Sequence, residues 1–316
     1  MSYTQLTQDE RYHIQHHLHQ PLSQIAQDLG RSKSTISREI RRNSKNGSYR
    51  AADAVEHNRR RRSRSPYKRT AALCRSINRL IRLKLSPEQV CAYLEKHCGI
   101  RLHHSTVYAH IAQDKIRGGR LWQHLRIAAK PYRKWRGSIW TKGKVPDRTD
   151  IGNRPDIINR KQRIGDWEAD TVVGLGQESA LLTLVERKTK YLIIVRLNGL
   201  TAEETAMAMI GALKRHKANA HSVTMDNGKE FYRHIKVAKA LGAKTYFCRP
   251  YRSWEKGLNE NTNGLIRQYF PKGTDFNKIS DAQIRRVQEA LNNRPRKTLD
   301  YETPNSLFLG RFVKLI

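Results

Sequence analysis

The chain has 316 residues, which is enough for two or three domains, and 38% of them are hydrophobic. Its formal net charge of +33 opposes self-compaction and favours a polyanionic partner, with nucleic acid as the first candidate and an anionic membrane surface as the second. The sequence has no signal-peptide pattern and no apolar run of about 18 residues, which argues against a membrane protein.

The first 48 residues contain the start signals of three short helices. Thr7 and Glu10 form a capping-box pattern, Gly30 is placed to end the second helix, and Ser32 is placed to cap the third. Isoleucine and leucine recur at helical spacing in each segment, which gives every helix one apolar side. We expect these helices over residues 7–18, 21–29 and 33–43.

The third of these helices combines small hydroxyl residues with arginines on its outward side, whereas Ile36 and Ile40 face inward. Two short helices, a glycine turn and such a third helix predict a helix-turn-helix domain over residues 1–48, because short polar side chains reach base edges and arginines bind guanine or phosphate. The alternative is a three-helix bundle with a charged exterior. The expected DNA contacts are Lys33, Ser34, Thr35, Ser37, Arg38, Arg41 and Arg42.

Residues 49–70 contain a run of four arginines and show no apolar period from Arg59 onward. We expect a basic linker here that contacts phosphates; the alternative is a solvated helix end. The arginines expected to contact DNA are Arg59, Arg60, Arg61 and Arg62.

Histidine and cysteine patterns do not predict a zinc site. Four histidines crowd the first helix, but no acid or cysteine completes a ligand set, so we expect them to be exposed polar residues. The four cysteines are widely spaced and form no Cys-x-x-Cys pair, which favours free thiols in a reducing cytoplasm.

A second three-helix unit is expected over residues 71–117. Its first helix is predicted over 71–84, its second after the start signal Ser86–Gln89, and its third from Ser105. We interpret it as a second helix-turn-helix domain in which Ser105 and Thr106 contact DNA. The alternative is a dimerisation bundle of the same shape.

Residues 118–160 form a basic connector with scattered glycine, proline and tryptophan. Basic residues interleaved with aromatics suit an extended arm along DNA or a partner subunit. The alternative is a folded connector whose tryptophans pack on the next domain. These tryptophans are Trp122, Trp135 and Trp140.

From residue 161 to 316 the pattern changes to α/β. Three strands in a row, followed by alternating helices and strands, predict a mixed sheet with helices on its faces and a turn-rich tail. We expect strands over residues 166–173, 180–186, 191–197, 221–225 and 243–247. We expect helices over residues 201–217, 231–241, 260–270 and 280–292.

Three acids are placed on these elements in a way that suggests a shared site. Asp170 lies in the first strand, and Asp226 ends the fourth strand just before an Asn-Gly turn. Glu260 lies on a helix whose same face presents Asn263, Gly264 and Arg267. We expect this polar face to approach DNA, with Asn263 and Arg267 as contacts and the glycine permitting close approach.

Asp170, Asp226 and Glu260 supply hard oxygen ligands, which suit Mg²⁺ or Mn²⁺ rather than zinc. Three converging carboxylates repel one another unless cations lie between them. The pattern therefore predicts two divalent ions and phosphodiester chemistry, in which a water and later a DNA 3′ hydroxyl attacks. The alternative is that Asp226 belongs to a plain turn and Glu260 is a solvated helix residue.

Three stretches resemble the catalytic core of DDE transposases and retroviral-type integrases: Trp167–Thr171, Met225–Phe231 and Asn259–Arg267. There are 33 residues between Asp226 and Glu260, which is near the spacing of that superfamily. With the N-terminal pattern and the closing segment Leu291–Lys297, the chain is identified as a member of the bacterial insertion sequence thirty transposase family. Ala169 and Lys256 stand where glycine and arginine are more usual.

The resemblance implies a multidomain fold of all-α helix-turn-helix modules followed by an α/β ribonuclease-H-like catalytic domain with a mixed sheet. It implies a catalytic and metal-binding triad of Asp170, Asp226 and Glu260 that uses Mg²⁺, with Mn²⁺ as a substitute. Its DNA partners would be the terminal inverted repeats and a target site. We expect a homodimer or larger homo-oligomer on DNA, associated with the nucleoid in the bacterial cytoplasm.

Two other functions are consistent with parts of the sequence. One is a DNA-binding transcriptional regulator with an inactive catalytic core, and the other is a nuclease that cleaves without joining. The intact set of acids argues against the first, and the paired DNA-binding modules argue against the second. Three nearby acids are not assigned as ligands: Glu168, Glu230 and Glu255.

Overall fold

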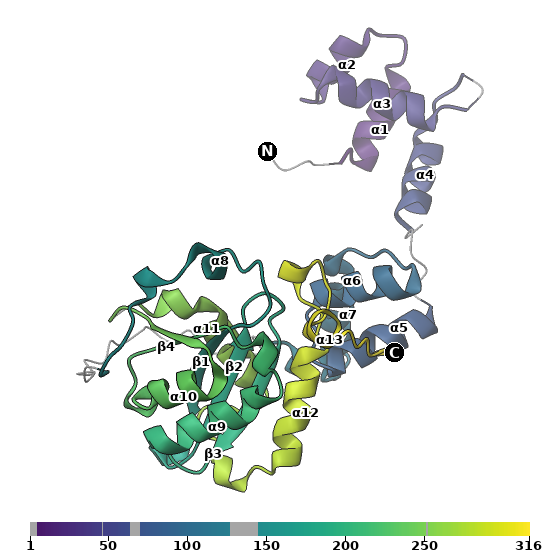
Figure 1. Cartoon of the computed structure of the whole chain (residues 1–316). Coiled ribbons are helices and arrows are strands. Elements are labelled where there is room, and N and C mark those ends of the chain that lie inside the picture. Colours follow the sequence, from purple (N-terminus) through teal and green to yellow (C-terminus); the bar gives the residue numbers. More distant parts are fainter. Residues whose placement is uncertain (1–4, 46, 64–69, 127–144, 251) are drawn as a thin grey trace. The chain divides into compact units, whose positions relative to one another are not determined.

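The computed structural model describes residues 5–45, 47–63, 70–126, 145–250 and 252–316. The chain forms two compact units, Met1–Ala71 and Ala72–Ile316. None of the helices within those ranges has the length and apolar character needed to cross a membrane. Figure 1 labels most of the helices and strands of both units.

The first unit is a small helical domain with its own core. Thr7 and Glu10 form the predicted capping box at the start of its first helix, and Ser32 caps the third through the amide of Thr35. Ile14, Ile25 and Ile36 come from three different helices and are fully buried. Its helices are α1 (Gln8–His16), α2 (Leu22–Asp28), α3 (Lys33–Asn43) and α4 (Ala51–Ser63).

Helix α4 replaces most of the basic linker that the sequence predicted over residues 49–70. Ala51 and Ala54 are buried against the first unit's core, and the amide of Ala51 donates to Oε1 of Gln15 on α1 at 2.7 Å. Arg61 donates to Oδ1 of Asn43 at 2.8 Å, which joins α4 to the end of α3. The prediction was wrong here because two alanines are too small to produce a visible apolar period, and the helix is stabilised by contacts distant in sequence.

The second unit begins with three helices around a separate core. Ser86 and Gln89 form the predicted capping box, and Gly99 ends that helix with a left-handed φ of 65°. The third helix begins one residue before the predicted Ser105, since His103 serves as its N-cap. The elements of this segment are α5 (Ala71–Arg82), α6 (Pro87–Cys98), α7 (His104–Ile116) and η1 (Leu121–His124).

The remainder of the second unit contains the predicted mixed sheet, with strand order β3-β2-β1-β4-β5. β1 pairs antiparallel with β2, which pairs antiparallel with β3, whereas the β1–β4 and β4–β5 pairs are parallel. β1 therefore lies at the centre of the sheet. The strands are β1 (Asp166–Val173), β2 (Ala180–Glu186), β3 (Leu192–Leu197), β4 (Ser222–Met225) and β5 (Lys244–Phe247).

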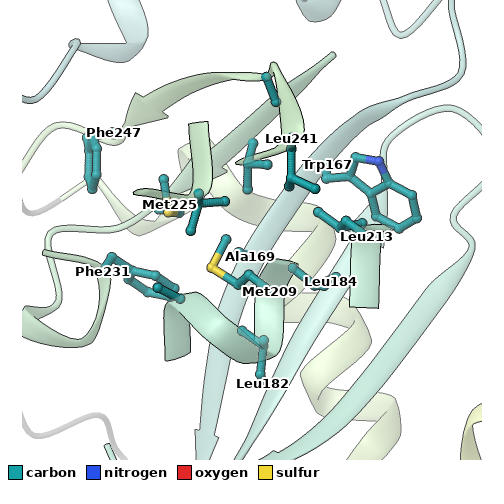
Figure 2. Packing of buried hydrophobic residues seen from close by; sticks show 14 of the residues in the cluster. Trp167, Ala169, Leu182, Leu184, Met209, Leu213, Met225, Phe231, Leu241 and Phe247 are labelled. Atoms are coloured by element: carbon teal, nitrogen blue, oxygen red, sulfur yellow. The ribbon is translucent and has the colours of Figure 1, made fainter. Parts of the chain in front are cut away.

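Helices cover both faces of this sheet. On one face, Trp167 and Ala169 of β1 pack with Met209 and Leu213 of α9 in a fully apolar cluster, part of which Figure 2 shows. On the other face, Val172 of β1 packs with residues of α11 and α12. Side chains alternate along a strand, so Asp170 is directed to the face that α11 covers. The covering helices are α9 (Ala202–Lys214), α10 (His234–Leu241), α11 (Gly257–Ile266) and α12 (Asp281–Asn292).

Several boundaries differ from the predictions. The helix expected over 231–241 is split into a short 3-10 turn and α10, and the helix expected over 260–270 begins and ends earlier as α11. A helix in the predicted turn-rich tail, α13 (Pro304–Leu309), stacks Phe308 on Tyr191 with 4.4 Å between ring centroids. The remaining short elements are η2 (Ile151–Asn153), α8 (Asp156–Asn159), η3 (Leu175–Gln177), η4 (Lys217–Asn219), η5 (Lys229–Phe231), η6 (Ser253–Lys256), η7 (Phe276–Lys278) and η8 (Lys297–Leu299).

The three-helix segment is bonded directly to the sheet domain. Nζ of Lys84 donates to the carbonyl of Gln268 at 2.8 Å, and Arg294 donates to the carbonyl of Lys84 at 2.5 Å. Gln89 donates to the carbonyl of Pro295 at 2.6 Å. These contacts fix the end of α5 and the start of α6 on the segments that follow α11 and α12.

The described ends of the predicted 118–160 connector are folded rather than extended. Trp122 packs against the core of the three-helix segment, and the carbonyl of His124 accepts a hydrogen bond from Gln268 at 3.0 Å. Trp135 and Trp140 lie outside the described residues. The connector is therefore folded at Trp122, but this tryptophan packs on the preceding three-helix segment rather than on the next domain, as the alternative had it.

Candidate metal centre

Asp170 lies towards the carboxyl end of β1, and Asp226 directly follows the carboxyl end of β4, the neighbouring parallel strand. The last paired residues of β1 and β4 are Glu168 and Thr224, and each aspartate follows its pair by two residues. The ladder between the two strands ends at that pair, so the two carboxylates lie where the strands begin to separate. Both side chains are partly exposed, at 23% and 29%.

Lys256 lies between these two carboxylates. Its Nζ is 3.1 Å from Oδ1 of Asp170 and 3.8 Å from Oδ2 of Asp226, and it donates to the carbonyl of Ala169 at 3.0 Å. The lysine side chain is only 7% exposed. A single buried ammonium thus bridges the two predicted ligands.

The charge of this lysine follows from its neighbours. Burial lowers the pKa of Lys256, but attraction to Asp170 and Asp226 outweighs burial, so the pKa is raised overall. The ammonium therefore stays protonated at neutral pH. The site between the aspartates is one that favours positive charge.

Asn263 of α11 fixes the other oxygen of Asp170. Its Nδ2 donates to Oδ2 of Asp170 at 2.8 Å, and its Oδ1 accepts from Thr183 at 3.1 Å. The sequence assigned Asn263 to DNA, whereas the structure gives its amide two internal partners. Its role here is to position the first aspartate.

Arg267 also differs from its predicted role as a DNA contact. Its guanidinium donates to the carbonyl of Val173 at 2.7 Å and to that of Pro271 at 3.3 Å, and burial lowers the pKa of Arg267. The space beside Gly264, expected to admit DNA, is occupied by Arg126, whose Nη2 lies 2.9 Å from where a Cβ would stand. These arginines join α11 to β1 and to the residues after η1.

Glu260 is exposed on α11, one turn before Asn263. Residues three apart share a helix face, so Glu260 lies on the face that reaches Asp170. Within the described part of the chain, the side-chain carboxylate of Glu260 has no hydrogen bond or ion pair, and no three acids, histidines or cysteines are gathered closely enough to hold a metal ion. The structure thus brings Asp170 and Asp226 together but leaves Glu260 apart from them.

Glu230, which the sequence did not assign as a ligand, lies close to the aspartates. Thr171 donates to its Oε1 at 3.1 Å. Burial raises the pKa of Glu230, and the charges of Asp226 and Asp170 raise it further. Gly228 has an ordinary φ of −67°, but a Cβ there would meet Oε2 of Glu230 at 2.3 Å. A larger residue at position 228 would therefore have to displace the carboxylate of Glu230.

The two other unassigned acids have structural partners. Glu168 is buried, forms an ion pair with Arg187 and accepts from the amide of Asn259 at 3.3 Å. Glu255 accepts from the amide of Arg249 at 2.8 Å. Sequence alone gave no sign of the roles of Lys256 and Glu230, since both depend on turns that return the chain to β1.

The predicted DNA contacts of the first unit lie mostly on its surface. All seven on α3 are exposed except Thr35, which is half-buried. Arg38 folds back to the carbonyl of Ser34 at 3.0 Å. On α4, Arg59 and Arg60 pair with Glu56, whereas Arg61 is bonded to Asn43. The side chain of Arg62 lies outside the described residues.

The corresponding residues on α7 are less open. Ser105 is exposed, and its hydroxyl lies 2.8 Å from Nδ1 of His103 at the helix cap. Thr106 is half-buried. Their assignment to DNA stays a prediction.

Known protein families match both the N-terminal helical part and the sheet-containing part of the chain. A family described as a helix-turn-helix domain matches residues 2–43, and one described as an integrase core domain matches residues 160–253. The fold thus defines a helix-turn-helix protein with an integrase-like core and a mixed five-stranded sheet, as predicted.

Curated relatives match over nearly the whole chain. The transposase for insertion sequence element IS4351 of Bacteroides fragilis is 41% identical over 310 residues, covering 96% of this chain and 95% of that protein. Transposase InsI for IS30A of Escherichia coli is 34% identical, covering 96% and 82%. The chain belongs to the family of insertion-sequence transposases that includes those of IS4351 and IS30.

A distant structural match is the catalytic core domain of BIV integrase. It is 18% identical and covers 47% of this chain and 95% of that one, with a TM-score of 0.38. At this similarity the match adds nothing to the family assignment.

Proposed function

We propose that this protein is a transposase that binds the terminal inverted repeats of its insertion sequence, cleaves DNA strands at the element ends and joins the 3′ hydroxyl to target DNA. The observation that supports this proposal is that Asp170 and Asp226 lie on either side of the buried ammonium of Lys256, near the carboxyl ends of β1 and β4. Paired carboxylates that face a cation are what phosphodiester chemistry with divalent metal requires.

The residues fit a divalent metal at this position. Asp170 and Asp226 offer carboxylate oxygens, and the ammonium of Lys256 between them supports a position that favours positive charge. Glu260 is the third proposed ligand, and it lies on the helix face that reaches Asp170. Two Mg²⁺ ions, or Mn²⁺ in their place, would activate the attacking oxygen and stabilise the leaving oxygen when bound.

The other residues of the chain would orient this site and bring DNA to it. Asn263 holds Oδ2 of Asp170 in a fixed direction. In the first unit, α3 presents exposed basic and hydroxyl side chains suited to the major groove. We assign base recognition to this unit, and we propose that α7 gives a second contact to the element end.

A transposition reaction joins two element ends to one target, so we also propose that the chain acts as a homodimer or larger homo-oligomer on DNA. Its place of action would be the nucleoid in the bacterial cytoplasm. Size-exclusion chromatography with light scattering, with and without a terminal-repeat duplex, tests the oligomer; a single chain per DNA end under all conditions contradicts it.

The reaction is tested by Asp170→Asn, Asp226→Asn and Glu260→Gln in the full chain, with Glu95→Gln on α6 as a matched exposed control. Each of the three variants should abolish strand cleavage while it still binds a terminal-repeat duplex in a mobility-shift assay, and the control should cleave normally. Normal cleavage by any one of the three removes that residue from the proposed site.

The assay also separates the two other functions. Wild-type protein that binds element ends but never cleaves, with Mg²⁺ or Mn²⁺ present, would be a DNA-binding regulator. Cleavage without strand joining to a supplied target duplex would identify a nuclease.

A further inference from the structure

We propose that Lys256 is a built-in counter-ion, which holds Asp170 and Asp226 in place without metal and competes with divalent metal for the same oxygens. This inference rests on the metal site proposed above. It makes Lys256 a positioning residue whose charge sets how readily the site takes up metal.

The first reason is the position of the ammonium. Nζ contacts Oδ1 of Asp170 at 3.1 Å and approaches Oδ2 of Asp226 to 3.8 Å. Asn263 holds the other oxygen of Asp170. A divalent ion shared by the two aspartates would need the oxygens that the ammonium now faces.

The second reason is that Lys256 is itself held in place. Its side chain is 7% exposed and its ammonium also donates to the carbonyl of Ala169. The residue lies at the junction of η6 and α11, and the next turn is fixed where the amide of Asn259 donates to buried Glu168. Lys256 is therefore part of the folded core rather than a surface lysine that meets the aspartates by chance.

The third reason is electrostatic. Two partly buried carboxylates at one sheet edge repel each other, and one positive charge between them removes much of that repulsion. A divalent ion at close range would be repelled by the same ammonium, so one of the two cations must give way. Lysine suits this exchange, because its compact charge lies on a flexible stem.

The inference is tested by metal binding to full-length protein stripped of metal with a chelator. The variant Lys256→Met keeps the length of the side chain and removes its charge, and Lys256→Arg keeps the charge. Lys244→Met is the matched control, since Lys244 is an exposed lysine on β5 of the same unit. Mn²⁺ affinity is measured by electron paramagnetic resonance of the free ion, and Tm is measured with and without Mn²⁺.

We expect Lys256→Met to bind Mn²⁺ about tenfold more tightly than wild type, or tighter still, because the competing charge is gone. Its Tm without metal should fall, and Mn²⁺ should raise that Tm more than it raises the wild-type value. Lys256→Arg and Lys244→Met should both bind Mn²⁺ as wild type does. A merely structural lysine would lower Tm without tightening metal binding.

The outcomes separate this inference from the proposed function. If folded Lys256→Met binds Mn²⁺ no more tightly than wild type, the counter-ion role of Lys256 is wrong. If Asp170→Asn also abolishes Mn²⁺ binding in that case, the proposed metal site is still supported. Absence of Mn²⁺ binding in wild type and Lys256→Met alike overturns the metal site and this inference with it. If Lys256→Met does not fold without metal, Lys256→Gln provides the same comparison, because its amide removes the charge but keeps a donor for the carbonyl of Ala169.

Discussion

Asn263 donates a 2.8 Å hydrogen bond to Asp170, which joins α11 to the central strand of the sheet. This bond also connects Glu260, one turn earlier on the same helix, to the strand that contains the first aspartate. The orientation of Asp170 therefore depends on a residue that the sequence assigned to DNA.

Replacing Asn263 with alanine should weaken catalysis rather than DNA binding. Loss of one positioning hydrogen bond costs about 1 kcal/mol, which corresponds to a roughly fivefold slower cleavage. Cleavage rate at saturating protein and affinity for a terminal-repeat duplex are the two measurements. Asn261→Ala is the matched control, because Asn261 is exposed on the same helix. Reduced affinity with unchanged saturated cleavage would restore the DNA-contact assignment.

The closing segment Leu291–Lys297 comprises the end of α12 and the residues that follow it. The segment supported the family resemblance, but its physical roles were not visible. Asn292 exchanges hydrogen bonds with Leu192 on the edge strand β3, at 2.9 and 2.8 Å. Arg294 and Pro295 are bonded to the loop and helix around Lys84 and Gln89. Such contacts join residues about a hundred or two hundred positions apart in the sequence. The spacing of apolar residues predicts local helices and strands but not contacts at these separations.

The strands were predicted closely because their patterns are local and strong. Continuous apolar runs predicted β2 within its observed bounds, and the turn residues after it predicted the start of β3 to within one residue. Asp170 and Asp226 were assigned to one site from their places on the predicted strands and from the family resemblance, and the structure puts them on β1 and just after β4, which pair in parallel. Lys256 was missed because a lysine before a helix gives no sign that its side chain returns to β1.

Arg38 should distinguish element ends from random duplex. It is exposed on α3, where its guanidinium donates to the carbonyl of Ser34, and arginines on a major-groove helix commonly bind guanine. We expect Arg38→Ala to weaken binding to a terminal-repeat duplex about tenfold and binding to random duplex much less. Arg60→Ala, on α4, should weaken both duplexes equally. Equal losses for Arg38→Ala would mean that Arg38 contacts only phosphate.

The first unit depends on a buried ion pair between α1 and α3. Nε of Arg11 lies 2.6 Å from Oε1 of Glu39, with both side chains at least nine-tenths buried, and Arg11 also donates to the carbonyl of Leu6 at 2.8 Å. Arg11→Met leaves the Glu39 carboxylate without its partner. We expect a loss of about 3 kcal/mol in the free energy of unfolding of a fragment of residues 1–71, measured in urea.

The double variant Arg11→Met with Glu39→Leu should recover much of that loss, because no uncompensated charge stays buried. Glu56→Gln, which breaks only exposed ion pairs on α4, should cost well under about 1 kcal/mol. A single variant as stable as wild type would show that the pair contributes nothing to this unit.

Glu230 should make the metal-free protein less stable as pH rises. Burial and the charges of Asp226 and Asp170 raise the pKa of Glu230 above its ordinary value of 4.5. Below that ordinary value the carboxyl is protonated in both the folded and the unfolded chain, so it has no effect on stability. As pH rises, the unfolded chain loses the proton first, and the folded state loses stability until the raised pKa is passed.

Glu230→Gln removes this effect. The free energy of unfolding of the variant should therefore equal that of wild type at about pH 4 and exceed it at about pH 7.5. Urea unfolding of the metal-free full chain at both pH values measures it. Glu178→Gln, an exposed acid after η3, should show no such growth. Metal is left out because a bound cation would offset the repulsion from the two aspartates. If the difference in the free energy of unfolding between Glu230→Gln and wild type instead shrinks as pH rises, the folded site stabilises Glu230 as a carboxylate. That result would contradict the raised pKa expected for a half-buried acid beside two like charges.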